Sequence, residues 1–520
     1  MSSCRIAVPG PVAPHVVGST QFLKERGYAP YTVGERVRAA EHLGRWMERS
    51  DLKLEDLAAA ETIDSFGRHF AKCRSTKGGG GEYERRRPEL TVLYEAVQRG
   101  WPSVQESLPE RIREEVRRFL ECGLLRYGMV TVKCEECLEL SLIAFSCKKR
   151  GWCPSCTTRR AVEVSLRLNA QLPFVAHRQW TLSLPRGLRL AVVKQPRVLK
   201  LVERALVRAV WRWQRATAKR LGVTQRLQGG AVAFTQWFSS NLSLTPHLHV
   251  LLPEVLWKPS GEVVELPRPD DEEVEGVLRR LVLQLKAVLA QAEGALPEDE
   301  YEGLQAASVQ DRMVLGDKRR PEAKKRRVAL GLGFSLHADT AAHGNDREGL
   351  ARLCRYASRG PVAEERLQRL PDGRYQYATK KGAVLVLTAH ALVKRLVALV
   401  PPARVHLTSS HGVYAANARL RPVVLQPEPE EATPTPSPVK DEAPDKAKPR
   451  RPGRLDWATL QAKTFGTDVW KCPRCGGHRR VVGLVTSRQT AEELLEKLGL
   501  LTPRRLLPPE RGPPQLELSM

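Results

Sequence analysis

Two histidines lie one residue apart in the apolar run TPHLHVLLPE, residues 245–254. Residues two apart in a β-strand point to the same side, so the sequence predicts that His247 and His249 share one face of a strand. Imidazole nitrogens are common ligands of divalent metal ions. The pair would supply two ligands of a metal site that needs a third, although two hydrogen-bonded histidines without a metal would fit the same spacing.

A tyrosine about a hundred residues later could act as a nucleophile. The stretch GNDREGLARLCRYASRGP, residues 344–361, predicts a helix that begins after Asn345 as N-cap, with Glu348 completing a capping box, and that ends at Gly360. On this helix Tyr356 lies at the edge of the apolar stripe. A phenol bordered by guanidinium groups suits attack on a phosphodiester, because positive charge neutralises the phosphate; an ordinary boundary tyrosine is the alternative. The neighbouring guanidinium groups belong to Arg352, Arg355 and Arg359.

Four cysteines form two C-x-x-C pairs within KCEECLELSLIAFSCKKRGWCPSCTTRR. Two such pairs at this spacing are typical of a tetrahedral zinc site with no open position, which organises the fold and does no chemistry. We therefore expect one structural zinc, and basic side chains around it that face nucleic acid. The predicted ligands are Cys134, Cys137, Cys153 and Cys156.

A further C-x-x-C pair, Cys472 and Cys475, lies in KCPRCGGHRR near the end of the chain. Only His478 follows as a third ligand, and no second pair comes after it. The sequence leaves two interpretations open here, a second zinc site and a tight turn that carries two thiols.

The composition favours a polyanionic partner. The chain has 84 Lys and Arg against 58 Asp and Glu, a formal net charge of +26, and such an excess attracts phosphates and gains free energy from counterion release. No secretory signal and no apolar run long enough to span a bilayer can be found, so we expect a cytoplasmic, nucleoid-associated protein without a membrane partner. An odd count of 11 cysteines argues against a disulfide framework.

The length of the chain and its linker-like segments predict several separate units. The four glycines in STKGGGGEYERRRP predict a flexible joint, and a Pro-rich charged stretch predicts a disordered linker. The predicted units are 1–75, helical; 76–90, flexible linker; 91–172, zinc-binding; 173–425, catalytic; 426–454, disordered linker; and 455–520, a small C-terminal unit.

Taken together, these residues resemble the HUH-type transposases of the insertion sequence 91 family, which move by a rolling-circle route. The resemblance runs through AFSCKKRGWCPSC, RQWTLSLP, PHLHVLLPE and GLARLCRYASRGPVAEERL. It implies an α+β fold in which an HUH endonuclease domain, a central antiparallel sheet flanked by helices, follows a zinc ribbon. It further implies that His247 and His249 hold Mg²⁺ or Mn²⁺ and that Tyr356 attacks single-stranded DNA or hairpin transposon ends, leaving a 5′-phosphotyrosine. The front segment, with FLKERGYAPYTVGERVRAAEHLGRWM, resembles the DNA-gripping domain of tyrosine recombinases.

The sequence departs from the family pattern at two places. Arg352 stands where some members have a second tyrosine, so the chain matches a single-tyrosine branch. Pro253-Glu254 stands where the family pattern has Asp-Gly after the histidine strand. The third metal ligand stays open among Gln236, which lies on the expected neighbouring strand, His337 and Asp346. Lys380 and Lys381 are expected to join the arginines along the DNA path.

Two other functions fit part of this pattern. A replication initiator with the same chemistry would need the same residues, but the zinc ribbon and the front helical unit favour transposition. A non-catalytic zinc-dependent DNA-binding protein would need only the basic charge and the cysteines. A covalent adduct with DNA separates the enzymes from the binding protein.

Overall fold

A computed structural model describes residues 91–292, 299–309, 326–380, 382–425, 456–466, 468–498 and 500, with scattered positions between 12 and 65. Among the latter lies a short 3₁₀ helix, η1 (Leu54–Ala58). The predicted linkers at 76–90 and 426–454, most of the predicted helical unit at 1–75, and Lys381 lie outside the described residues.

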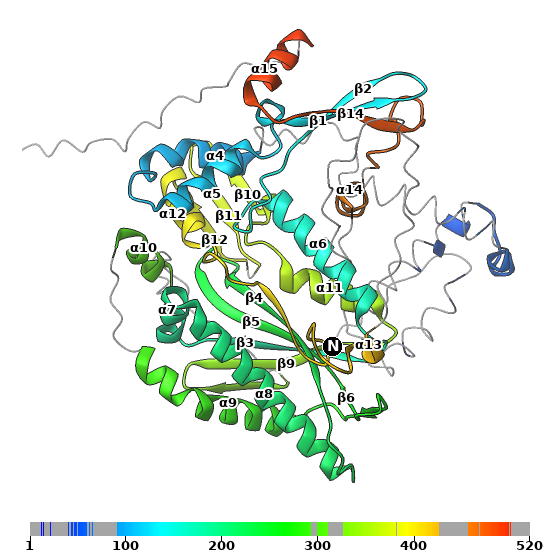
Figure 1. Cartoon of the computed structure of the whole chain (residues 1–520), viewed down its shortest axis with the longest axis vertical. Coiled ribbons are helices and arrows are strands. Elements are labelled where there is room, and N and C mark those ends of the chain that lie inside the picture. Colours follow the sequence, from blue (N-terminus) through cyan, green and yellow to red (C-terminus); the bar gives the residue numbers. More distant parts are fainter. Residues whose placement is uncertain are drawn as a thin grey trace, which may run out of the picture.

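A six-stranded antiparallel sheet forms the centre of the molecule (Figure 1), in the order β13-β4-β5-β3-β9-β8. Helices flank it, which confirms the predicted α+β class with a central antiparallel sheet. The strands are β3 (His177–Ser183), β4 (Gly230–Phe238), β5 (Leu244–Pro253), β8 (Val328–Gly331), β9 (Phe334–Ala342) and β13 (Thr408–Gly412).

The two faces of the sheet follow from the alternation of side chains along β5. Leu248, Val250 and Leu252 are buried in the main core, as the sequence predicts, together with apolar residues of three helices. The opposite face carries the histidines and Leu251, which packs in a second core. The helices on the first face are α7 (Arg186–Lys194), α8 (Pro196–Arg220) and α9 (Asp271–Ala292).

Helix α11 (Arg347–Ser358) packs on the histidine face, and α6 (Pro154–Gln171) packs against α11. The Ser165 hydroxyl on α6 donates a hydrogen bond to the Ala351 carbonyl on α11 at 2.7 Å. Just beyond α11, a Cβ on Gly360 would lie 2.3 Å from the hydroxyl of Thr157, so only glycine allows this approach. The helix that follows the predicted zinc ligands therefore supports the helix that carries Tyr356.

A second group of elements lies at one end of the central sheet (Figure 1). Elements of this group pack closely against one another. A Cβ on Gly100, for example, would lie 2.4 Å from the Ala389 carbonyl oxygen. Its members are α4 (Val92–Gly100), η3 (Trp101–Ser103), α5 (Glu110–Glu121), α10 (Glu300–Val309), η5 (Glu364–Arg366), β10 (Leu367–Arg369), β11 (Tyr375–Ala378), β12 (Val384–Leu387) and α12 (Ala389–Ala398). The short η4 (Leu125–Tyr127) contacts β2 (Leu140–Ala144) and α15 (Arg488–Lys497) instead. Two small features belong to neither group. They are a two-stranded ribbon of β6 (Val255–Trp257) and β7 (Val263–Glu265), and the short helix α13 (Arg421–Val424).

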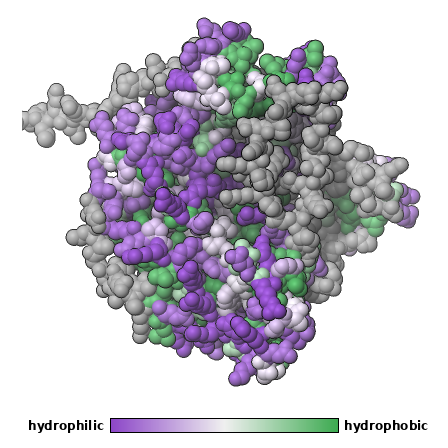
Figure 2. Space-filling view, in the orientation of Figure 1, coloured by the Kyte–Doolittle hydropathy of each residue, from purple (hydrophilic) through white to green (hydrophobic). Residues whose placement is uncertain are grey.

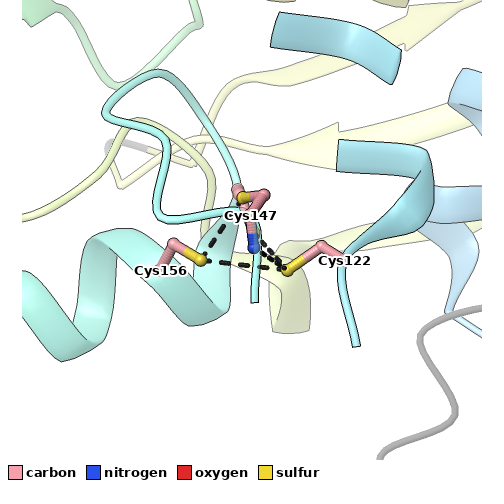
Figure 3. Close-up of side chains that lie close together, drawn as sticks. Cys122, Cys147 and Cys156 are labelled. Atoms are coloured by element: carbon pink, nitrogen blue, oxygen red, sulfur yellow. Dashed lines mark hydrogen bonds between the residues drawn. The ribbon is translucent and has the colours of Figure 1, made fainter. Parts of the chain in front are cut away.

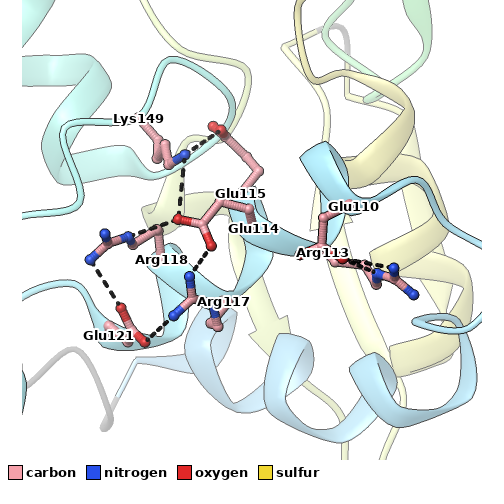
Figure 4. Close-up of polar contacts among 8 residues, drawn as sticks. All are labelled: Glu110, Arg113, Glu114, Glu115, Arg117, Arg118, Glu121 and Lys149. Atoms are coloured by element: carbon pink, nitrogen blue, oxygen red, sulfur yellow. Dashed lines mark hydrogen bonds and ion pairs between the residues drawn. The ribbon is translucent and has the colours of Figure 1, made fainter.

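Helix α5 carries a network of ion pairs at i, i+3 and i, i+4 spacing (Figure 4). Lys149 joins it from the loop between β2 and α6, 4.0 Å from a Glu114 oxygen and 3.9 Å from a Glu115 oxygen. This lysine was expected to face nucleic acid, but its charge is engaged with carboxylates. Exposed pairs of this kind contribute little stability each, so the network mainly fixes the loop's position.

The C-terminal segment contributes one strand to a small three-stranded sheet, and residues 129–144 contribute the other two. Strand β14 (Arg479–Val485) pairs antiparallel with β1 (Met129–Cys134), which also pairs with β2 (Leu140–Ala144). Helices α14 (Trp457–Phe465) and α15 (Arg488–Lys497) flank β14 in the sequence. Residues 455–520 were predicted as a small C-terminal unit, and their strand β14 completes the sheet of residues 129–144.

Hydrophilic side chains cover most of the described surface on the face shown in Figure 2. Among the described helices, none combines the length and the apolar character needed to cross a membrane.

His177, at the start of β3, makes folding stability sensitive to pH. Its ring is fully buried, its Nδ1 lies 2.8 Å from the Val175 carbonyl oxygen and its Nε2 lies 3.0 Å from the Tyr414 hydroxyl. Burial lowers its pKa from 6.5 to about 4. Between these two values the unfolded chain binds a proton that the folded chain does not, so the free energy of unfolding falls as pH falls, by at most about 1.4 kcal/mol per pH unit for this group.

We expect urea unfolding at pH 7 and pH 5 to show this loss, and His177→Gln to reduce the difference between the two pH values while lowering stability at both. An unchanged difference in the variant would show that His177 does not titrate in this way.

Candidate catalytic and metal sites

The two histidines occupy the centre of the sheet face that α11 covers. On β5, His247 lies opposite Gln236 of β4, and His249 lies opposite Thr181 of β3. Their ring centroids are 5.0 Å apart. The strand prediction therefore holds, and the rings are neighbours on one face.

Hydrogen bonds orient both rings. The Nδ1 of His247 lies 2.7 Å from the Thr245 carbonyl oxygen, which can only accept, so this nitrogen carries the proton and Nε2 keeps its lone pair. The Nδ1 of His249 lies 3.1 Å from the Thr181 hydroxyl oxygen, which also accepts from the Gln179 amide at 3.2 Å. Such outer partners commonly fix the orientation of metal-ligating histidines.

Burial also keeps both imidazoles neutral. It lowers the pKa of His247 to about 4 and the pKa of His249 well below its usual 6.5, and the positive charge of Arg359 acts in the same direction. A neutral imidazole is the form that binds a metal ion. At neutral pH a cation would therefore not have to displace a proton from either ring.

Gln236 is positioned to complete a ligand set. Its amide nitrogen donates to the carbonyl oxygens of Tyr356 at 2.6 Å and Ala357 at 3.1 Å, so its Oε1 is the remaining acceptor. Both this Oε1 and the Nε2 of His249 are buried without a hydrogen-bond partner. Buried polar atoms of this kind are rare unless a water or an ion binds them. The residues thus fit a divalent cation held by two imidazole nitrogens and an amide oxygen.

The other two candidates for the third ligand have different surroundings. Asp346 is the N-cap of α11 and accepts a hydrogen bond from the Gly349 amide at 2.8 Å. This corrects the prediction of Asn345 as N-cap, because the helix begins one residue later. His337 lies on β9, across β3 from β5, where its cross-strand neighbour is Thr181. Of the three, Gln236 alone pairs with a histidine of the site.

Tyr356 lies beside the histidines. Its ring meets that of His249 edge to face, with centroids 5.7 Å apart, and it is 39% exposed, so a substrate can reach it. The Arg359 guanidinium lies 4.9 Å from the centroid of the phenol ring and the Lys380 ammonium 4.5 Å from it. Two cations thus border the phenol, one of them from a segment twenty residues beyond α11.

The remaining predicted charges are placed differently. Arg352 forms an ion pair with Glu348 at 3.2 Å, one turn earlier on α11, and Arg355 is exposed on the same helix. Glu254, which follows the histidine strand, accepts a hydrogen bond from Arg178 at 2.7 Å. That carboxylate is therefore committed to a cation and does not belong to the histidine site.

A small pocket lies between α6, the end of β4 and the end of α11. Its volume is about 50 Å³, and no acidic side chain lines it. The polar atoms Trp237 Nε1, Ser358 Oγ and Arg359 Nε are buried without partners, and all three residues line the pocket. Arg150 and Arg160 line it from the zinc-binding side. Its donors and positive charge suit an anion.

The cysteines form two groups of four, and the grouping differs from the predicted one. Cys153 and Cys156 cluster with Cys122 and Cys147, not with the first C-x-x-C pair. Their sulfurs lie 3.3 to 3.8 Å apart where they are in contact (Figure 3), close to the roughly 3.8 Å separation of four thiolates around one zinc. We call this group the first cluster. It lies where α6 begins, since Cys153 is the N-cap of that helix.

The second cluster joins Cys134 and Cys137 to Cys472 and Cys475. The missing partner of the C-terminal pair is thus the first C-x-x-C pair, brought in by the pairing of β1 with β14. His478 is not a member: its Nδ1 lies 3.3 Å from a Glu135 oxygen.

Sequence reasoning missed several of these residues. Cys122 and Cys147 were not predicted as ligands, because neither belongs to a C-x-x-C pair. Thr181 gave no signal, although alternation along the run RQWTLSLP could have placed it on the histidine face.

Comparison with protein families identifies two regions of the chain. The family model described as "Transposase zinc-binding domain", of the insertion sequence 91 type, matches residues 95–184, and the family model described as "Putative transposase" matches residues 230–421. The first region contains the whole first cluster, and the second contains Gln236, both histidines and Tyr356. No curated protein and no solved structure matches the chain. With a zinc-binding domain followed by a transposase domain, the chain belongs to the transposases of the insertion sequence 91 family.

Proposed function

We propose that this transposase cleaves and rejoins single-stranded DNA through a covalent 5′-phosphotyrosine at Tyr356, as rolling-circle transposition requires. The observation that carries the proposal is the contact between the phenol ring and His249, whose Nε2 is buried without a partner. The proposed nucleophile, which is exposed, thus lies beside the proposed metal ligands, of which Gln236 and His249 are buried, and beside two cations.

In the proposed step the Tyr356 oxygen forms a bond to the scissile phosphorus, and the bond from phosphorus to the 3′ oxygen breaks. The phenol loses its proton and the departing 3′ oxygen gains one, so the products are a 5′-phosphotyrosine and a free 3′-hydroxyl. Attack by a 3′-hydroxyl on the phosphotyrosine reverses the step and rejoins a strand. One phosphodiester is exchanged for another, so the reaction needs no external energy source.

The histidine site would hold the cation that such a step requires. His247 and His249 would bind through their Nε2 atoms and Gln236 through Oε1. An imidazole and amide set is compatible with Mn²⁺ and Mg²⁺. A bound divalent cation supplies Lewis acidity to the scissile phosphate.

The chain would hold one DNA end at a time. Arg352 occupies the position one turn before Tyr356, where a second nucleophile would lie, and it is paired with Glu348. Arginine cannot take the role of a nucleophilic tyrosine. Two ends held covalently at once would therefore require two subunits.

The pocket beside α11 would bind a phosphate next to the scissile one. Its two unpartnered donors on α11, Ser358 and Arg359, come two and three residues after the nucleophile. DNA phosphates accept hydrogen bonds from such donors and from guanidinium groups. Arg150 and Arg160 would let the zinc-binding domain contact the same strand. Lys380 and Arg355 would extend the basic path, and Lys381 is proposed with them on sequence alone.

Arg359→Ala is expected to weaken binding of single-stranded DNA about tenfold and to reduce cleavage further, because one guanidinium serves both the pocket and the phenol. Fluorescence anisotropy with a labelled oligonucleotide at several salt concentrations would measure it, and the salt dependence should become shallower. Arg279→Ala, an exposed arginine on α9 across the sheet, is the matched control. Equal effects of the two substitutions would argue against a phosphate at this pocket.

The full chain, incubated with hairpin single-stranded DNA and Mn²⁺, tests the function itself. We expect a protein-DNA adduct that survives denaturation, and we expect a chelator to prevent it. Retarded DNA without any adduct would instead indicate a DNA-binding protein that does not cleave.

A further inference from the structure

We propose that the second cluster is a zinc site that fastens the C-terminal segment of the chain to the zinc-binding domain. Of the four cysteines in the second cluster, the matched zinc-binding domain, residues 95–184, contains only Cys134 and Cys137. The other two ligands, Cys472 and Cys475, come from more than 300 residues later, beyond the end of the matched transposase domain at residue 421. One ion would then close the chain on itself.

The sulfur positions fit a single tetrahedral ion. All four sulfurs lie within 4.8 Å of one another. Cys134 and Cys475 are 3.5 Å apart, and Cys137 and Cys472 are 3.6 Å apart, near the separation of roughly 3.8 Å expected for four thiolates on zinc. Each contact joins one early and one late cysteine. A disulfide would need sulfurs about 2.05 Å apart, so the four thiols are not paired as disulfides.

The backbone at both pairs has the same turn. The residue after each second cysteine is left-handed, Leu138 with φ 61° and Gly476 with φ 81°. Such a turn lets backbone amides point at the sulfur, and the Gly477 amide donates to the Cys475 sulfur at 3.4 Å. A leucine in this conformation costs about 1 kcal/mol, and this one is 62% exposed, so packing does not compensate for it. Ligation by the adjacent cysteine accounts for the strained residue.

The two segments are also joined by the ladder of β1 with β14 and by two small apolar clusters, one around Val132 and Val469 and one around Met129 and Leu495. Their polar contacts are fewer. The Glu135 amide donates to the His478 carbonyl oxygen at 2.9 Å, and Arg474 pairs with Glu139 at 3.1 Å on the surface. Exposed ion pairs contribute little stability, whereas a structural zinc contributes far more. The ion would therefore add to the ladder and the apolar clusters in holding β14 on β1.

Metal content tests the proposal. The full chain, expressed with zinc in the medium, is expected to carry two zinc ions per chain by elemental mass spectrometry, and the double variant Cys472→Ser, Cys475→Ser is expected to carry one. Cys354→Ser, a buried cysteine outside both clusters, should keep two. A double variant that keeps the full zinc content of the parent chain would overturn the proposal.

Alkylation of the unmodified chain tests it without any substitution. Cys475 is exposed, so a free thiol there would react with iodoacetamide at once. We expect Cys475 to be protected in the zinc-loaded chain, and the four cysteines of the second cluster to become reactive together when a chelator removes the ion. Immediate alkylation of Cys475, or release of Cys472 and Cys475 independently of Cys134 and Cys137, would contradict the proposal even if the first cluster and the DNA chemistry behave as proposed.

Discussion

Tyr356→Phe is expected to abolish the covalent adduct with single-stranded DNA and to leave binding of that DNA within a factor of about three. The substitution removes only the attacking oxygen, while the ring that contacts His249, Arg359 and Lys380 remains. Loss of a nucleophile lowers the rate of covalent chemistry by several orders of magnitude, roughly 10³-fold or more. The basic path and the pocket, which would provide the affinity, are unchanged.

The position of the label on the DNA makes this result specific. A 5′-phosphotyrosine keeps the fragment downstream of the cut, so a label at the 3′ end should stay with the protein and a label at the 5′ end should be released. Tyr127→Phe, a partly buried tyrosine on η4 far from the histidines in the sequence, should behave as the parent chain. An adduct retained in Tyr356→Phe would mean that another residue attacks, and a retained 5′ label would mean that the polarity is reversed.

Local patterns predicted the parts of the site that depend on one element. Alternation along residues 245–254 placed His247 and His249 on one face because side chains in a strand alternate whatever lies beside them. Helical periodicity placed Tyr356 at the edge of the α11 stripe for the same reason. The start of α11 was missed by one residue, because Asn345 and Asp346 are both good N-caps and only the folded chain shows which one accepts the amide hydrogen bond.

The grouping of the cysteines could not be predicted in this way. A C-x-x-C pair shows that two thiols lie together, but its spacing to other pairs does not say which of them it meets. Here Cys134 is the last residue of β1, the strand with which β14 pairs, and Cys137 follows in the loop before β2. Cys153 and Cys156 lie at the start of α6. Contacts across more than 300 residues depend on tertiary structure, as does the cross-strand register that places Gln236 beside His247.

The first cluster would couple a bound zinc ion to the position of Tyr356, the proposed nucleophile. Its ligands lie where α6 begins, and α6 supports α11 through the bond from Ser165 to Ala351 and the close approach of Thr157 to Gly360. Any loosening of α6 would therefore reach the helix that carries Tyr356. The second cluster has no such contact with α11.

Cys153→Ser is accordingly expected to lose one zinc ion and to reduce adduct formation by at least about 100-fold, although it leaves every proposed catalytic residue in place. Cys153 is buried and is the N-cap of α6, and a structural zinc contributes on the order of 10 kcal/mol to the fold that binds it. Elemental analysis, thermal unfolding and the labelled adduct assay on the same preparation would measure the three effects together. The double variant Cys472→Ser, Cys475→Ser is the matched control, because it removes the other zinc and leaves the cysteines at the start of α6 unchanged. If Cys153→Ser retained its zinc and its thermal stability, Cys153 would not be a ligand; if it lost the zinc and kept full adduct formation, α6 would not position Tyr356.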